Sequence, residues 1–477
     1  MKGKGVVAKK ENLWYTDKKL RKGASYMNDR TLDMTAGKPL SLIVRFALPL
    51  MLGNVFQQLY TVVDTAVVGK ALGVSALAAL GAADWPNWMF LSIIQGLTQG
   101  FGILMAQDFG ARQTEQLRRS IGGSISLSAV GAALFLIVGQ LLILPVLHLL
   151  QTPSEILPGS ALYLRIMFGG IPIVMAYNLL ACILRSMGDG KTPLIAMVIA
   201  SFVNIGLDLL FVLAFHWGIA GAAAATLIAQ VCASGICLLQ LRKFSDLQLK
   251  RSDFFPGWRL ATHLLGLGSP VAMQNAIISI GGMIVQTVIN GFGVVFMAGI
   301  VATNKLYGIL EMAALSYGYA MITYTGQNLG AGKIKRIRSG MRTGLGVSLV
   351  TSVVIAALML SFGEWIVGCF ISGTPQEIAE ATQVGYGYLT VMSLCLPILY
   401  VLHVFRSCVQ GAGNTVLPMV SGIAEFVMRT GAALLLAMVM GQTGIYYAEV
   451  LAWLGATLIL IPSYFFVLKQ HRKNSPE

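Results

Sequence analysis

Residues 45–64 read Arg45-Phe-Ala-Leu-Pro49-Leu-Met-Leu-Gly-Asn54-Val-Phe-Gln-Gln-Leu-Tyr60-Thr-Val-Val-Asp64. This stretch is apolar over a length that can cross a bilayer as a helix, yet it contains a proline and a carboxylate. A charged side chain in the hydrocarbon core costs at least ~2.5–3.5 kcal/mol, so an ionisable residue there indicates a function. The stretch therefore predicts a transmembrane helix in which Asp64 has a functional role.

The whole chain has the composition of a polytopic α-helical membrane protein. Of its 477 residues, 56% are hydrophobic and 11% are charged, which is about half the charged share of a soluble protein. Apolar windows recur along the chain without the dyad alternation of an outer-membrane barrel. We expect twelve spans, with these approximate bounds: 41–68, 76–107, 120–147, 161–184, 193–215, 218–240, 262–288, 295–329, 341–370, 385–406, 416–439 and 444–468.

The basic residues predict how these spans are oriented. The net charge of +14 could suggest a nucleic-acid partner, but the cations lie between spans and form no basic soluble module, so we expect no nucleic acid. Residues 1–40 show no apolar signal-peptide region and no cleavage site. With both termini in the cytoplasm, the cytoplasmic segments would hold all 34 Lys and Arg residues except Lys70, Arg165, Lys305 and Arg429. This bias predicts a multi-pass protein of the cytoplasmic (inner) membrane.

No pattern in the sequence indicates a metal centre, a cofactor or a catalytic site. The six cysteines lie mostly inside predicted spans without metal-ligand spacing, so neither a zinc site nor a disulfide framework is indicated. The run Gly188-Asp-Gly-Lys-Thr192 lacks the spacing of a nucleotide-binding P-loop. We expect no metal, no cofactor and no nucleotide, and we expect that the protein is not an enzyme.

The chain repeats itself. A shift of 221 places Pro49 on Pro270, and a shift of 220 places Gln107-Asp-Phe-Gly110 on Gln327-Asn-Leu-Gly330. Because each half holds an even number of spans, both halves have the same orientation, and a substrate site between them is the usual arrangement in transporters. We expect an all-α polytopic membrane protein of two parallel six-helix repeats. Its parts would be a basic cytoplasmic tail (1–40), an N-terminal lobe (41–240), a cytoplasmic linker (241–261), a C-terminal lobe (262–468) and a cytoplasmic tail (469–477).

Several motifs occur in a characteristic order. They are Pro49 to Asp64, Ala106-Gln-Asp-Phe-Gly110, Leu184-Arg-Ser-Met-Gly-Asp-Gly-Lys-Thr-Pro193, Asn204-x-x-x-Asp208, and Gly218-Ile-Ala-Gly-Ala-Ala. Together they resemble the multidrug and toxic compound extrusion (MATE) family of secondary transporters, within the MOP superfamily, over about residues 40–468.

Four polar residues should lie at one depth inside the N-terminal lobe. Asp64 and Asp208 each follow a proline by fifteen residues, about 22 Å of helical rise. Asn204 lies one turn before Asp208 on the same helix face, and Thr226 of the next helix falls at the same level. Depth alone therefore predicts a cluster of these four residues, although it does not fix how each helix is rotated about its axis.

Such a cluster could bind a proton or a cation. Burial favours the neutral form of a carboxyl group, and a second nearby acid favours it further. The alternative is that Asp64 and Asp208 only cap helix ends or hydrogen-bond one another. The resemblance implies function, because proton-coupled relatives use an acid at the position of Asp64 and a pair matching Asn204 and Asp208. Pro49 would then supply a hinge in its helix.

The sequence departs from one branch of the family. Sodium-coupled NorM-like members carry a glutamate in the seventh helix and an aspartate in the tenth, whereas this chain has Ile278 near the first position and no acid from Tyr386 to Phe405. The cation site of that branch is absent, and the chain resembles the DinF-like branch. H⁺ is the favoured coupling ion, but Na⁺ at Asp64, Asn204 and Asp208 stays open.

Other polar and soft residues are expected to line a central substrate cavity, together with Tyr60. Asp84 and Lys305 are equivalent under the repeat and could form a salt bridge between the lobes in one access state, or each could meet water separately. Glu311 could attract cationic compounds or make a structural hydrogen bond. Met89 and Met312 would suit a site that accepts varied apolar shapes.

Two further expectations concern the charged residues at 406, 425 and 429. Glu425 and Arg429 are four residues apart on one predicted helix, which favours an intrahelical ion pair. Arg406 is expected to anchor a helix end at the lipid headgroups.

The resemblance implies a multidrug efflux antiporter that exports hydrophobic, often cationic compounds in exchange for H⁺ or Na⁺ by alternating access. A flippase for a lipid-linked precursor is the alternative, and it would need a strongly cationic cavity. A channel would conduct down the substrate gradient alone. The expected partners are small organic substrates and the lipid bilayer, with the protein a monomer.

Overall fold

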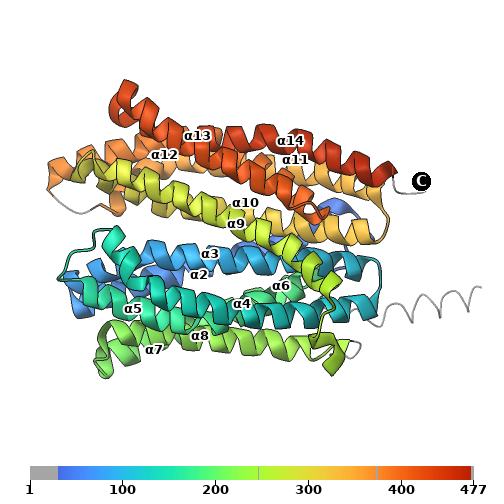
Figure 1. Ribbon diagram of the computed structural model, residues 1–477. Coiled ribbons are helices and arrows are strands. Elements are labelled where there is room, and N and C mark those ends of the chain that lie inside the picture. The colour runs from blue at the N-terminus through green and yellow to red at the C-terminus, as the bar shows by residue number, and fades with distance from the viewer. Residues whose placement is uncertain (1–30, 245–246, 372–373, 474–477) are drawn as a thin grey trace, which may run out of the picture.

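The chain folds into long helices that run side by side in two bundles (Figure 1). The computed structural model describes residues 31–244, 247–371 and 374–473, and these contain no strand. The N-terminal lobe consists of α2 (Pro39–Leu72), α3 (Val74–Gly110), α4 (Thr114–Leu149), α5 (Leu157–Gly169), α6 (Ile171–Ser186), α7 (Lys191–Asp208), the π-helical turn η1 (Leu209–Ala214) and α8 (Gly218–Leu241).

The C-terminal lobe follows a short 3₁₀ turn, η3 (Arg251–Phe254). It consists of α9 (Trp258–Asn290), α10 (Val294–Gly330), α11 (Ile334–Cys369), α12 (Pro375–Gly411), α13 (Val416–Met440), the 3₁₀ turn η4 (Gly441–Tyr447) and α14 (Ala448–Lys473). The loops between α3 and α4, between α10 and α11, and between α8 and α9, together with the first turns of the helices that follow them, are rich in basic residues. They lie at the right of Figure 1, together with the C-terminus, and we call this side the basic end.

The predicted fold class is confirmed. Within the described residues, ten helical stretches are long and apolar enough to span a membrane, or eleven if α5 and α6 count as one bent span. One of the ten, Val416–Lys473, contains both α13 and α14, so the count agrees with about twelve spans. The repeat is also visible in the helices: α3 and α10 both have 37 residues, and α4 and α11 both have 36.

The break between α5 and α6 has a local cause. The two helices meet at Gly170 at an angle of 49°. Pro172 occupies the first turn of α6, where its missing N–H costs nothing, but it could not continue a straight helix from α5. A Cβ at Gly170 would overlap the Leu227 side chain, so glycine lets α8 pack closely against the bend.

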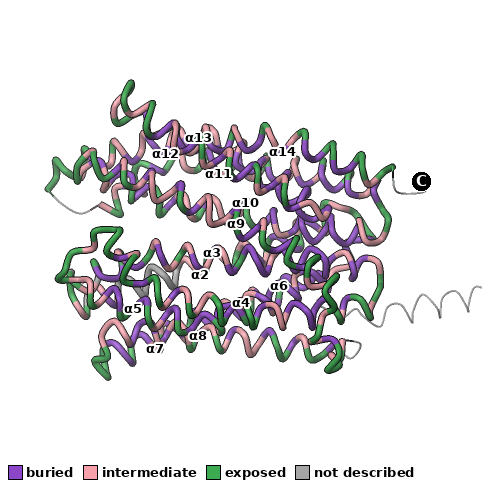
Figure 2. The backbone as a smooth tube through the Cα atoms, in the orientation of Figure 1, coloured by how far each residue is buried: buried purple, intermediate pink, exposed green. Residues whose placement is uncertain are grey.

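Small residues bring the two lobes into contact along α3 and α9. A Cβ added to Gly96 would lie 2.7 Å from Ala272 Cα, and one added to Gly100 would overlap the backbone of Gly268. Near the basic end, Cβ atoms at Gly110 and Gly330 would overlap the carbonyl groups of Gln327 and Gln107. Figure 2 shows buried positions gathered where the bundles meet on this side. Close helix approach of this kind needs residues without bulky side chains.

The short segment before α2 connects both lobes at the basic end. Leu32 N–H donates to Gly188 O of the N-terminal lobe (3.1 Å). Met34 N–H donates to Gln327 Oε1 (2.9 Å), and Asn328 Nδ2 donates to Met34 O (2.9 Å), both in the C-terminal lobe. Met34 itself is fully buried. This segment therefore stabilises the arrangement in which the lobes are closed at the basic end.

Candidate functional site

Two groups of polar residues lie inside the lobes, one in each. In the N-terminal lobe, Asn204 and Asp208 are both buried in α7, with 1% and 0% of their surface exposed. Asn204 Nδ2 lies 3.5 Å from Thr226 Oγ1 on α8, and the Thr226 hydroxyl donates to Ala222 O (3.1 Å). The structure thus brings Asn204 and Thr226 together at the depth that the sequence predicted. We call Asn204, Asp208 and Thr226 the N-terminal cluster.

Local backbone structure sets Asp208 apart. The α-helix ends at Asp208 and the chain continues directly into the π-helical turn η1. Single π turns within helices occur often at functional sites, because they widen the helix and redirect its side chains. Asn204 Oδ1 is buried and has no hydrogen-bond partner within the described part of the chain. A buried amide acceptor of this kind suits a site that takes up a proton or a cation.

Two predicted residues fall outside what the structure describes: Asp64, the fourth member of this cluster, and Tyr60, which was predicted for the substrate cavity. The side chains of Tyr60 and Asp64 lie among the undescribed positions of α2. The helix that carries them packs along α7, the helix of Asn204 and Asp208. Pro49 lies inside α2, ten residues from its start at Pro39.

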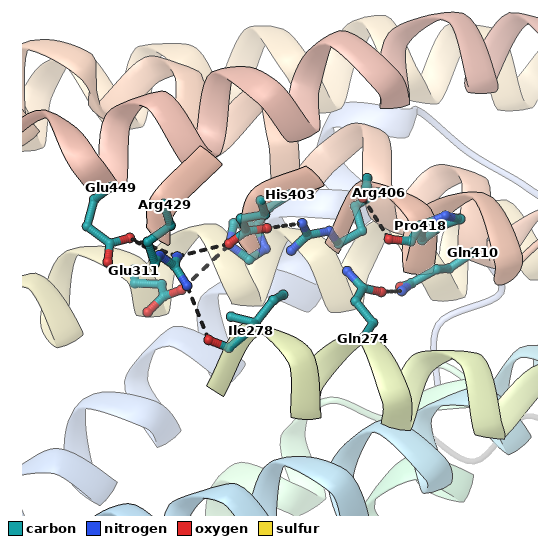
Figure 3. A network of polar contacts seen from close by, with 11 residues as sticks. Gln274, Ile278, Glu311, His403, Arg406, Gln410, Pro418, Arg429 and Glu449 are labelled. Atoms are coloured by element: carbon teal, nitrogen blue, oxygen red, sulfur yellow. Dashed lines mark hydrogen bonds and ion pairs between the residues drawn. The ribbon is translucent and has the colours of Figure 1, made fainter. Parts of the chain in front are cut away.

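The C-terminal lobe holds a buried network of ionised side chains (Figure 3). Arg429 donates to Glu449 Oε2 (2.8 Å) and to Glu425 Oε1 (3.1 Å), and its Nη1 donates to the Ile278 carbonyl of α9 (3.3 Å). Arg406 Nη2 donates to the other oxygen of Glu425 (2.5 Å). Arg406, Glu425 and Arg429 each expose less than a tenth of their surface. We call Arg406, Glu425, Arg429 and Glu449 the C-terminal ion network.

This network confirms one expectation and corrects another. The ion pair between Glu425 and Arg429 forms within α13, as their spacing predicts. The expectation that Arg406 anchors a helix end at the headgroups is wrong, because Arg406 is buried and bound to Glu425. Glu449 was missed, although an acid in the first turn of an apolar span is the same kind of signal that marks Asp64.

The residues predicted for the cavity lie on the helices between the lobes. Asp84 and Lys305 both expose their side chains, and no ion pair within 4.0 Å joins them in this conformation. Glu311, in the middle of α10, exposes 33% of its side chain and lies 3.8 Å from His403 Nε2. Met89 and Met312 are partly buried on α3 and α10.

The hydrogen bonds between the lobes lie from the middle of the helices to the basic end. Among the described residues they include Asn275 Nδ2 to Ser92 O (2.8 Å), Gln107 Nε2 to Gly411 O (3.1 Å) and Gln327 Nε2 to Ser186 O (2.9 Å). Asp84 and Lys305 come before these contacts along α3 and α10, nearer the opposite end. The two lobes are therefore joined toward the basic end, whereas the exposed charges of Asp84 and Lys305 lie on α3 and α10 toward the opposite end.

Comparisons with known proteins agree with this architecture. The MatE family model matches the chain twice, at residues 49–210 and 270–435. A probable multidrug resistance protein of Bacillus subtilis, YpnP, is 30% identical over 419 residues, covering 87% of this chain and 92% of that protein. DNA damage-inducible protein F of Escherichia coli is 25% identical over 342 residues, covering 70% and 73%. A solved MOP superfamily transporter from Pyrococcus furiosus superposes with a TM-score of 0.84 at 22% identity, covering 92% and 97%.

Proposed function

The chain belongs to the MatE family of multidrug efflux transporters, and from this we propose that it is a secondary antiporter. It exports hydrophobic, often cationic organic compounds in exchange for H⁺ by alternating access between the two lobes. The N-terminal cluster, completed by Asp64, takes up the coupling ion. In this proposal the protein lies in the plasma membrane with the basic end and both termini in the cytoplasm, an orientation that the Lys and Arg bias favours.

The observation that carries this proposal is the burial of Asn204, which lies beside Thr226, and of Asp208 one turn further along α7. A fully buried carboxyl group in a membrane protein is costly, and it is tolerated where it serves ion or proton movement. Asn204 adds a buried acceptor oxygen without a partner in the described residues. Protonation of a carboxylate here removes a charge from the lobe interior, so the surrounding helices can repack. Pro49 supplies the weak point at which α2 can bend.

The contacts between the lobes support alternating access. In the proposed orientation, the junction at the basic end closes the transporter toward the cytoplasm and leaves Asp84 and Lys305 on the outward side. The reverse state requires the contacts of Gln107 and Gln327 to break. Asp84 and Lys305 could pair in that state or in an intermediate one.

The ion network argues against the flippase alternative. A flippase for an anionic lipid-linked precursor needs unpaired positive charge in its interior. Arg406 and Arg429 are each bound to carboxylates, of Glu425 and Glu449. Among the described residues within the spans, Lys305 of α10 and Arg165 of α5 are exposed cations without an ion pair, and Arg185 of α6 lies over the Tyr319 ring (4.7 Å). These separate charges on three helices make no strongly cationic cavity.

The test is efflux from proteoliposomes, with a pH gradient and a Na⁺ gradient imposed separately. We expect efflux of tetraphenylphosphonium to follow the pH gradient, and Asp64→Asn and Asp208→Asn each to reduce it at least about tenfold. Glu364→Gln, which changes an exposed carboxylate on α11, is the matched control. If only the Na⁺ gradient drives efflux, the coupling ion is Na⁺ and not H⁺. Wild-type efflux by Asp64→Asn and Asp208→Asn under both gradients would refute the coupling site.

A further inference from the structure

The buried ion network of the C-terminal lobe is balanced in charge, and one further carboxylate lies beside it. The ion network contains two arginines and two glutamates, so its four charges cancel. Glu311 of α10 lies beside it, and its interaction with Glu449 is repulsive. No arginine or lysine lies within ion-pair distance of Glu311 in the described part of the chain. With a neutral His403, the ion network and Glu311 together therefore carry one negative charge more than they carry positive. Lys305, the nearest cation before Glu311 along α10, makes no ion pair with it.

His403 is placed to compensate that charge. Its Nε2 lies 3.8 Å from Glu311 Oε1, and Figure 3 shows the two side chains facing each other. Its side chain is 10% exposed, so the imidazole lies behind the more accessible Glu311. The distance is longer than a hydrogen bond, which leaves room for the pair to close when the imidazole is charged. Histidine is the side chain whose charge changes near neutral pH.

The groups around this pair come from five helices. They are Tyr307 on α10, Tyr400 and Arg406 on α12, Glu425 and Arg429 on α13, and Glu449 on α14. From α9 come the Gln274 side chain, which accepts a hydrogen bond from Gln410, and the Ile278 carbonyl, which accepts from Arg429. Within the described residues, no ion pair joins α2, α9 or α11 to this region. The arginines are already bound to Glu425 and Glu449, and Lys305 is not within ion-pair distance of Glu311, so a proton on His403 can neutralise this carboxylate without breaking a pair.

We propose that Glu311 and His403 form a proton-binding site in the C-terminal lobe, separate from the N-terminal cluster. His403 Nε2 accepts one proton from water, and the imidazolium pairs with the Glu311 carboxylate; no other bond forms or breaks. A hydrophobic organic cation that approaches Glu311 repels the imidazolium and releases this proton. The role of the Glu311–His403 site in transport rests on the proposed antiport, whereas proton binding at this site does not depend on it. The exchange would then carry a proton from each lobe.

Proton binding is measured directly on the full-length protein in lipid nanodiscs. Nuclear magnetic resonance of ¹³C-labelled histidine follows all five histidines of the chain as the pH is varied. The signal lost in His403→Gln belongs to His403; if that variant does not fold, replacing the other four histidines one at a time assigns the signal by elimination. In Glu311→Gln, the charged fraction of His403 at a given pH should be lower than in wild type, because the carboxylate that favours the imidazolium is gone.

His148 is the internal control, because it is exposed at the end of α4 and lies in the other lobe. Its titration should be the same in wild type and in Glu311→Gln. If His403 stays neutral over the whole range, or titrates identically in both proteins, the proposal is wrong. This result does not depend on transport, so it remains decisive even if the Asp64→Asn experiment refutes the coupling site.

The role in exchange is tested by proton release. Tetraphenylphosphonium is added to the purified protein in weakly buffered solution, and the protons released are counted with a pH indicator. We expect His403→Gln to release about half as many protons as wild type, and Asp64→Asn to lose the other half. Equal release by His403→Gln and wild type would exclude His403 from the exchange.

Discussion

Replacing Glu425 by glutamine should destabilise the protein more than any exposed charge change. Glu425 binds Arg406 with one oxygen (2.5 Å) and Arg429 with the other (3.1 Å), and all three residues are buried. Glutamine keeps the shape but removes the negative charge, which leaves Arg406 without an ionic partner. Removing one member of a buried ion pair costs about 3–5 kcal/mol, because the remaining charge stays desolvated.

The expected change in melting temperature follows from the size of the chain. An unfolding entropy of about 2.1 cal/mol/K per residue gives about 1 kcal/mol/K for 477 residues, so Tm should fall by about 3–5 °C. Thermal unfolding of the detergent-purified protein, followed with a thiol-reactive dye, measures this. Glu364→Gln removes an exposed carboxylate of α11 and should leave Tm within about 1 °C.

A second variant separates charge imbalance from lost packing. Glu425→Gln combined with Arg406→Gln removes one positive and one negative charge and keeps the pair of Arg429 with Glu449. It should recover at least half of the loss, because no buried charge is left without a partner. Two results would show that the network does not stabilise the lobe through charge balance. One is a Tm of Glu425→Gln equal to that of Glu364→Gln, and the other is a Tm of the double variant below that of Glu425→Gln.

Three further outcomes follow from the contacts between the lobes. Gly96→Ala places a Cβ 2.7 Å from a backbone atom of α9, so the lobes must separate. We expect the population of the state closed at the basic end to fall by about 5- to 150-fold, which cysteine labelling at that end measures. Gln327→Ala removes the acceptor of Met34 N–H, and a cysteine at position 34 should then be labelled several-fold faster. Asp84→Lys and Lys305→Asp should each lower transport, and the two together should restore it if these residues pair during the cycle.

Each of these outcomes has a control or a contradicting result. A Cβ at Gly81 has no neighbour within 4 Å, so Gly81→Ala should label like wild type, and equal labelling of Gly96→Ala would contradict the tight crossing. Gln286→Ala changes a half-buried glutamine of α9, whose side chain donates to Asn290 of the same helix, and should not affect labelling at position 34. Absence of rescue in the charge swap would show that Asp84 and Lys305 never meet.

The sequence predicted the parts of the fold that depend on one helix at a time. Apolar length locates a span, because every buried backbone group must be hydrogen-bonded within the helix. Spacing along one helix likewise predicted the pair of Glu425 and Arg429. The depth of residues along two adjacent spans predicted the contact between Asn204 and Thr226, because both residues lie at the same level of neighbouring helices.

Rotation about the helix axes could not be obtained in this way. Arg406 was placed at the headgroups because its position along the chain is near a helix end, but its side chain points inward to Glu425. Glu311 and His403 lie on different helices and are 92 residues apart, so no local pattern joins them. Their meeting depends on how α10 and α12 face each other.

The sequence by itself determined that this chain spans the membrane about twelve times, in two repeated halves, with ionisable residues inside the spans. Those properties follow from hydrophobicity and from spacing along single helices. The tertiary structure alone decided which charges meet, since a charge pair across helices requires both a common depth and facing sides. Close approach at Gly96 and Gly100 sets how the lobes meet. Packing of α12, α13 and α14 sets which carboxylates the two buried arginines bind.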